Sequence, residues 1–202
     1  MVYVLDGNVY LMPGTRMAPA NMEVNALVLT IVEKAGQVPG RTSLQKLSYF
    51  ANEILVAGIG FRPHYYGPYS PEIAGVADVL VAANLLKEDL VNGLYFRSGR
   101  NREWTRHTYS LTEDGKKYLS WLSARGGFPE DEVRDLVEKL KAETNLDPEN
   151  LSKLAKVRFI SDQLGNRSPN PVEVSRTAKG LGWALPPAVA RKSLITLDRL
   201  GL

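Results

Sequence analysis

Residues 94–111 read LYFRSGRNREWTRHTYSL, and this stretch decides the fold that the sequence predicts. Its two ends, 94–96 and 105–111, are rich in aromatic and β-branched residues, which favour β-strands. Between them lies a glycine-containing turn, 97–102, that carries three arginines. The pattern predicts a β-hairpin with a basic turn.

Two helices are predicted before this hairpin. In residues 21–35 the apolar positions recur at helical spacing, and Gly36 follows where a left-handed cap is needed. Thr42 and Gln45 stand three residues apart, as in a capping box. This spacing predicts a second helix that starts at Thr42, carries an apolar stripe up to Leu55 and ends at Gly58.

A third helix is predicted between the second helix and the hairpin, and a fourth helix after the hairpin. Ser70 as N-cap and Pro71 at the first helical position start the third helix, which continues to about Leu86. Thr112 opens the fourth, which continues to about residue 122. This is the element order of a winged helix, a helix-turn-helix variant with a β-hairpin wing.

Three motifs in this region resemble a known family. They are GRTSLQKLSYF at 40–50, FRPHYYGPYSPE at 61–72 and YSLTEDG at 109–115. Together they are similar to the YwgA-like winged-helix family and, more distantly, to the Panacea (SocA-like) antitoxin domain, over about residues 21–124. The resemblance implies a winged-helix fold and a regulatory or antitoxin-like role, and it brings no catalytic residues.

The C-terminal third predicts three more helices. A proline follows a capping residue at Asp147 and again at Asn170, and a proline pair at 186–187 starts the last helix. Ala178 and Gly182 have the A-xxx-G spacing of a helix-turn-helix, in which alanine permits close helix packing and glycine makes the turn.

The predicted fold class is therefore mainly α with small β-hairpins: a winged helix-turn-helix plus a second, C-terminal helix-turn-helix unit. Asp6-Gly7, typical of a two-residue turn, predicts a further hairpin at the N-terminus. The predicted domains are an N-terminal β-hairpin at 1–20, a winged-helix domain at 21–126, an acidic connecting helix, solvated, at 127–148, and a helix-turn-helix domain at 149–202.

The charge is distributed unevenly over the 202 residues, although the formal net charge is only +3. Residues 151–202 hold nine lysines and arginines against three acids, and 93–110 hold four arginines against one acid. Residues 127–150 hold eight acids against three bases. The modest total conceals two basic regions, which permit a nucleic-acid partner.

Several classes of protein are disfavoured by composition. Cysteine is absent, which excludes disulfides, thiol nucleophiles and cysteine-ligated metals. Only His64 and His107 remain for histidine-based hydrolysis or metal binding, so we expect no enzyme, no metal and no cofactor. No signal peptide or membrane-spanning stretch is evident, which predicts a cytoplasmic protein without a membrane partner.

The last predicted helix, 187–200, is the main candidate for DNA binding. Its face opposite the leucines carries polar and small residues, and two cations precede it near the turn. Arg191 is the first candidate for base reading and Lys192 for phosphate contact. The candidate residues of this unit are Arg176, Lys179, Ala188, Arg191, Lys192 and Arg199.

The hairpin turn and a tyrosine cluster are weaker candidates. The arginines of the wing either lie along a DNA backbone or in a minor groove, or are exposed to solvent at the tip of a loop. They are Arg97, Arg100, Arg102 and Arg106. The tyrosines of 65–69 either stack on bases or pack against a helix. The third helix lacks lysine and arginine, which fits a core or a subunit interface better than DNA.

These observations predict a transcriptional regulator that binds double-stranded DNA as a homodimer. The alternative is a protein-interaction module of the antitoxin or adaptor type, with a protein partner and no DNA binding of its own. A carboxylate-dependent hydrolase or nuclease is a more distant alternative, which would need converging acids in a cleft.

Overall fold

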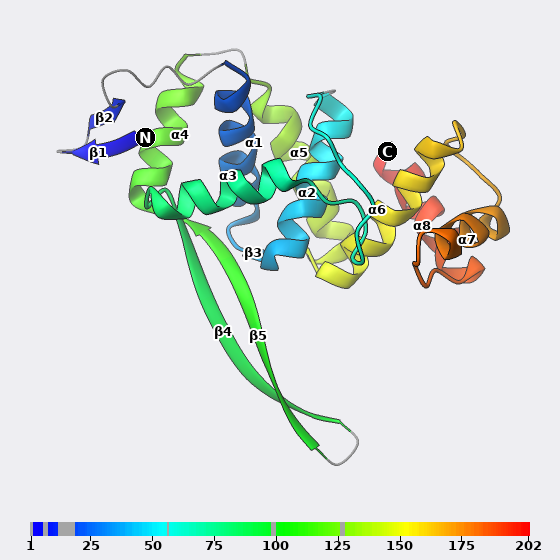
Figure 1. Ribbon diagram of the computed structural model, residues 1–202. Helices are drawn as coiled ribbons and strands as arrows, with labels where there is room; N and C mark the ends of the chain where they lie inside the picture. The colour runs from blue at the N-terminus through cyan, green and yellow to red at the C-terminus, as the bar shows by residue number, and fades with distance from the viewer. Residues whose placement is uncertain (1, 6–7, 12–18, 56, 98–99, 126–127) are drawn as a thin grey trace.

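The protein is mainly helical, with a small three-stranded antiparallel sheet (Figure 1). The structure is a computed structural model that describes residues 2–5, 8–11, 19–55, 57–97, 100–125 and 128–202, and within 1–23 and 91–106 only the backbone. No helix in the described ranges is long and apolar enough to cross a membrane.

The region predicted to resemble a winged helix contains four helices and three strands. The sheet has the order β3-β5-β4, and a separate antiparallel hairpin, as predicted, precedes α1. From the N-terminal hairpin onward, the elements up to residue 123 are β1 (Val2–Leu5), β2 (Asn8–Leu11), α1 (Pro19–Ala35), β3 (Val38–Pro39), α2 (Gly40–Leu55), α3 (Pro71–Ala82), β4 (Leu86–Arg97), β5 (Arg100–Leu111) and α4 (Glu113–Ser123). The predicted turn Asp6-Gly7 lies outside the described residues.

The central hairpin is longer than predicted. Strands β4 and β5 have 12 residues each and pair without interruption from Leu86 opposite Leu111 to Arg97 opposite Arg100. In Figure 1 they project from the helical body as a single arm. The prediction of a six-residue turn at 97–102 was wrong, because Arg97, Arg100 and Arg102 belong to the strands. Residues 98–99 lie outside the described part of the chain.

Helix α2 starts two residues earlier than the capping box predicted. It begins at Gly40, whose φ of +94° few other residues tolerate, directly after the short strand β3. Thr42 is therefore already inside the helix. The side chain of Gln45 forms two hydrogen bonds to the backbone of Ser70: it donates to the carbonyl at 2.9 Å and accepts from the N–H at 2.8 Å.

Helix α3 begins as predicted but ends earlier. Ser70 is its N-cap, with Pro71 at the first helical position. The helix stops at Ala82, because Asn84 takes a left-handed conformation with φ +57° and Leu86 starts β4. Helix α4 has the predicted N-cap, in which the Thr112 hydroxyl accepts the N–H of Gly115 at 2.9 Å.

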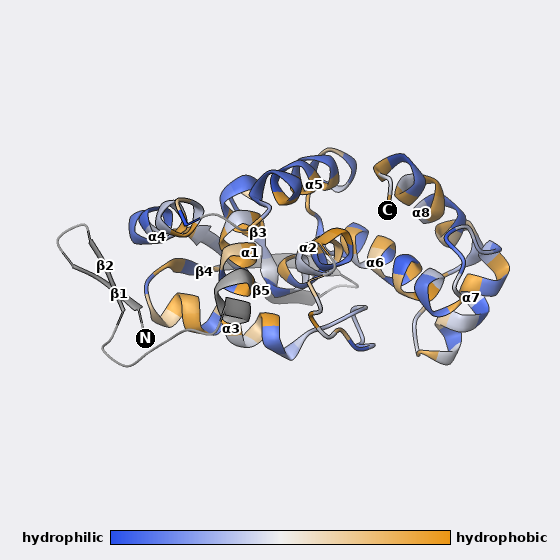
Figure 2. Cartoon of the chain, turned by 90° about the horizontal axis from the view of Figure 1, so that it is seen from above, coloured by the Kyte–Doolittle hydropathy of each residue, from blue (hydrophilic) through white to orange (hydrophobic). Residues whose placement is uncertain are grey.

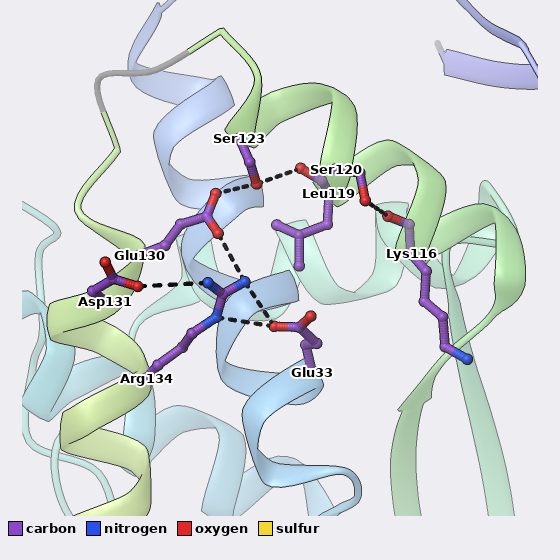
Figure 3. A network of polar contacts seen from close by, with 8 residues as sticks. All are labelled: Glu33, Lys116, Leu119, Ser120, Ser123, Glu130, Asp131 and Arg134. Atoms are coloured by element: carbon purple, nitrogen blue, oxygen red, sulfur yellow. Dashed lines mark hydrogen bonds and ion pairs between the residues drawn. The ribbon is translucent and has the colours of Figure 1, made fainter.

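The acidic segment forms helix α5 (Glu130–Thr144), which packs against α1. The expectation of a solvated connector was wrong for one of its faces, where Val133, Val137 and Leu140 are fully buried. An ion pair also joins α5 to α1: Arg134 contacts Glu33 of α1 at 3.0 Å. Figure 3 shows Arg134 surrounded by Glu33, Glu130 and Asp131.

Three helices complete the chain, and their starts agree with the prediction. They are α6 (Pro148–Gln163), α7 (Pro171–Gly180) and α8 (Pro187–Leu200). The side chains of Asp147 and Asn170 accept backbone N–H groups at the starts of α6 and α7. Helix α6 packs against both α2 and α8. Figures 1 and 2 both show α4 and the pair α7–α8 at opposite ends of the molecule.

A continuous cluster of buried apolar residues runs from Val24 in α1 to Leu197 in α8. It includes Leu47 of α2, Val137 of α5 and Val157 of α6, all fully buried. The N-terminal region and the C-terminal helices therefore share core contacts through α2, α5 and α6. The domain boundaries given above stay a prediction.

The N-terminus of α4 packs so closely on the turn after α3 that we expect Gly115→Ala to destabilise the protein. A Cβ at this position would overlap the carbonyl of Leu85 and lie 3.1 Å from Leu111 Cδ2. The expected loss is about 2 kcal/mol or more of unfolding free energy, measured by urea denaturation. The matched control is Gly75→Ala in α3, where open space surrounds the new methyl group and a gain of about 0.5–1 kcal/mol is expected. Equal stabilities of the two variants would contradict the close packing.

Candidate nucleic-acid interface

Helices α7 and α8 are joined by a tight turn with the predicted features. Ala178 is fully buried and Gly182 has φ +74°. The N–H of Trp183 donates to the carbonyl of Ala178 at 2.8 Å, which closes the end of α7. This turn requires a left-handed residue at 182, and glycine adopts that conformation at the lowest cost.

One side of α8 is open to solvent. Ala188, Arg191, Lys192 and Ile195 are all exposed, and their spacing of three, one and three residues places them on one helical face. The opposite side is buried through residues that include Ala190 and Leu197. Because α8 is amphipathic in this way, its exposed face combines two cations with a small and an apolar side chain.

The cations of the C-terminal region divide into paired and unpaired groups. Lys153 contacts Glu149 at 2.7 Å, and the buried Arg158 contacts Glu53 at 3.2 Å and Asp162 at 2.9 Å. On helices α7 and α8, by contrast, four exposed cations make no ion pair with any residue whose side chain the structure describes: Arg176, Lys179, Arg191 and Lys192. All four were predicted as site residues.

Arg199 differs from these four. Its guanidinium contacts Glu143 of α5 at 2.9 Å, so part of its charge is offset within the protein. The pair is exposed, and exposed pairs contribute little free energy, so a phosphate can compete with Glu143 for Arg199. Its predicted role in DNA binding stays a prediction.

The wing arginines are described only by their backbone. Arg97 and Arg100 face each other as the last pair of the β4–β5 ladder, Arg102 lies opposite Tyr95, and Arg106 lies opposite Val91. Their side chains lie outside the description. The register therefore places three of the four arginines at the far end of the arm and Arg106 closer to its middle.

A segment that bears three tyrosines, residues 64–69, lies beside the α7–α8 turn; we call it the tyrosine-bearing segment. Tyr65 and Tyr66 are 72% and 54% exposed and meet edge to face, with ring centroids 4.9 Å apart. They line a hollow of about 470 Å³ together with Lys153, Lys156 and the turn residues Gly182 and Leu185. The sequence left two interpretations for these tyrosines, stacking on bases or packing against a helix. Packing alone does not explain why Tyr65 and Tyr66 are so exposed, and their exposed ring faces are available for contacts.

The same segment accepts hydrogen bonds from α2 and from the C-terminal part of the chain. The Trp183 indole donates to the carbonyl of His64 at 2.7 Å, and the Ser152 hydroxyl donates to the carbonyl of Tyr66. From the other side, the ammonium of Lys46 in α2 donates to the carbonyl of Pro68 at 2.7 Å. The segment thereby holds the α7–α8 turn in a fixed position relative to α2.

Lys46 is the residue that sequence reasoning missed. It is only 2% exposed, whereas lysines are almost never fully buried unless they are paired. Burial, together with the nearby charge of Lys156, lowers the pKa of Lys46 to about 7. The apolar periodicity of α2 did not predict the burial of Lys46. Periodicity identifies one buried face of a helix, whereas every residue from Ser43 to Ala51 is buried. Only the position of Lys46 within an otherwise uncharged run could have suggested it.

Comparisons with known proteins add no assignment. Scans of protein-family models and of curated proteins find no match to this chain. The described residues contain no group of three or more histidines and carboxylates placed to hold a metal ion. The geometry of the exposed cations is therefore the basis for a functional interpretation.

The burial of Lys46 predicts a specific dependence of stability on pH. Its pKa of about 7 in the folded state lies below the ordinary value near 10.4 in the unfolded chain. Between these values the unfolded chain binds more protons, so the free energy of unfolding should rise with pH, by at most about 1.4 kcal/mol per unit from this group. Urea denaturation between about pH 7 and 9 measures the rise.

The control for this measurement is Lys139→Met, which removes an exposed lysine from α5. Lys46→Met should show a smaller rise than both the native protein and Lys139→Met. Part of the rise should persist in Lys46→Met, because burial also lowers the pKa of Lys156. An unchanged slope in Lys46→Met would mean that the ammonium is better solvated than its burial indicates.

Proposed function

We propose that this protein binds double-stranded DNA, mainly through helices α7 and α8. The observation that carries the proposal is the exposed face of α8, where Arg191 and Lys192 lie free of ion pairs among the described residues, beside Ala188 and Ile195. A recognition helix needs cations for phosphates, donors for base edges and small or apolar groups for thymine methyls. The exposed face of α8 offers all three.

The roles within this unit follow from the chemistry of the side chains. Arg191 carries a planar guanidinium that can bind a guanine edge through two hydrogen bonds, so it reads a base. Lys192 is a compact cation and contacts a phosphate. Arg176 and Lys179 on α7 contact the backbone beside the groove, as the first helix of a helix-turn-helix does.

The N-terminal region contributes a second contact as a winged helix. Its order α1-β3-α2-α3-β4-β5-α4 and the sheet order β3-β5-β4 support this interpretation. Twelve-residue strands extend for about 40 Å, so the arm reaches well beyond the helical body. In the proposed complex its arginines follow the DNA backbone or a minor groove.

Helix α3 does not take part in DNA binding in this proposal. It contains no lysine or arginine, and Glu72 and Asp78 are exposed on it. Val79 is 63% exposed on the same helix. An acidic and apolar surface suits contact with protein, and we propose it as the interface of a homodimeric transcriptional regulator.

The same surface favours a second function, that of a protein-interaction module of the antitoxin or adaptor type. In that case Val79 contacts a different protein, and the chain has no DNA affinity of its own. A stoichiometric complex with another protein, together with failure to bind DNA, would favour this alternative over the first proposal.

The DNA-binding proposal predicts that Arg191→Ala combined with Lys192→Ala weakens binding to a random-sequence duplex. Loss of two phosphate contacts reduces the slope of log affinity against log salt by up to about 2. If Arg191 instead reads a base, a specific site loses about 1–3 kcal/mol at that position. A salt series of fluorescence anisotropy titrations with the random-sequence duplex, starting at about 50 mM salt, measures the slope.

The matched control is Lys116→Ala combined with Lys117→Ala on α4, which removes the same charge from the opposite end of the molecule (Figure 1). This control should keep the native slope. Failure of the native protein to bind at low salt would overturn the proposal, and so would equal losses in the two double variants, because total charge would then explain the binding.

A further inference from the structure

A small pocket lies between α2, the tyrosine-bearing segment and α3, away from the exposed face of α8. Its volume is about 170 Å³. For comparison, an apolar cavity of about 150 Å³ in a protein core accommodates one benzene molecule. The pocket therefore has room for a single flat ring with a small substituent.

The walls of the pocket are apolar and aromatic. Helices α2 and α3 contribute Leu44, Ile73 and Ala77, all buried. The tyrosine-bearing segment contributes Tyr66 and Tyr69, whose rings suit stacking against a flat hydrophobic group. These side chains can hold a planar apolar molecule without forming a hydrogen bond to it.

The polar end of the pocket is formed by Lys46. Its only hydrogen-bond acceptor among the described residues is the neutral carbonyl of Pro68, at 2.7 Å. Arg158, the other buried cation in the described part of the chain, has two carboxylates, Glu53 and Asp162. The charge of Lys46 thus lacks the compensation that the protein supplies to Arg158, although buried charges are ordinarily paired.

The remaining charges at the pocket are already balanced. Arg41 contacts Asp78 and Glu88, each at 3.4 Å, and the Tyr109 hydroxyl donates to Glu88 at 2.6 Å. An anion entering the pocket therefore meets one uncompensated cation, the ammonium of Lys46, with Lys156 close enough to lower the pKa of that ammonium. An anion here would offset the repulsion between the two lysines.

We propose that this pocket binds a small flat monocarboxylate, with the ring between α3 and the tyrosines and the carboxylate at Lys46. One negative charge matches one uncompensated cation, and the apolar walls select a hydrophobic body. The proposal does not depend on DNA binding, because neither Arg191 nor Lys192 lines the pocket.

Benzoate is the probe that tests this proposal, and benzamide is its neutral counterpart of the same shape. Isothermal titration calorimetry of the native 202-residue chain should show saturable binding of benzoate at millimolar concentration or below. Benzamide should bind at least about tenfold more weakly, because it cannot form the charge-assisted hydrogen bond to Lys46. This comparison needs no variant and is independent of any effect on folding.

Two variants localise the binding. Lys46→Met keeps the aliphatic length and removes the charge, so benzoate affinity should fall by about tenfold or more, toward that of benzamide. Ala74→Leu enlarges a side chain that lines the pocket from α3 and keeps Lys46 itself, and it should weaken both ligands. Circular dichroism and thermal unfolding establish that each variant is folded.

Three results would overturn the proposal: no saturable benzoate binding by the native protein, equal affinity for benzoate and benzamide, or benzoate binding that survives in folded Ala74→Leu. If Lys46→Met does not fold, the benzamide comparison and Ala74→Leu still decide the question. DNA titrations play no part in these outcomes, so the pocket and the DNA interface can fail separately.

Discussion

The structure depends on two consecutive residues of α2 that bind the backbone of the segment before α3. The Gln45 side chain forms hydrogen bonds with both backbone polar groups of Ser70, and Lys46 donates a hydrogen bond to the carbonyl of Pro68. Ser70 is in turn the N-cap of α3, so the position of that helix follows from the amide of Gln45. Buried backbone groups must find partners, and a side chain that supplies both a donor and an acceptor satisfies one residue completely.

This anchoring extends to the other end of the molecule. Trp183 and Ser152 donate to carbonyls of the same segment, at His64 and Tyr66, so the segment is bonded from α2 on one side and from the C-terminal helices on the other. A connection that would otherwise run over the surface is thereby fixed in place. It sets the orientation of the α7–α8 turn, and with it the direction in which the exposed face of α8 points.

The sequence predicted features that depend on neighbouring residues and missed those that depend on distant ones. The caps at Thr112, Asp147 and Asn170 were predicted correctly, because a capping side chain acts within three residues. Gln45 has the same local spacing but bonds a residue 25 positions away, so its local pattern was misleading. The cationic face of α8 followed from helical periodicity, whereas the burial of Lys46 arises only when α2 is enclosed on every side.

The proposed DNA interface depends on how the charged side chains are placed on the helices. Two arginines on α5 and α6 are matched with acids: Arg134 with Glu33, and Arg158 with Asp162. These pairs join helices or cover buried groups, so the charges of both arginines are offset within the protein. Of the exposed cations on α7 and α8, only Arg199 makes an ion pair among the described side chains, while α3 presents acids instead. The exposed, unpaired cations of α7 and α8 are the feature on which the proposed phosphate contacts rest, even though the whole chain carries a formal charge of only +3.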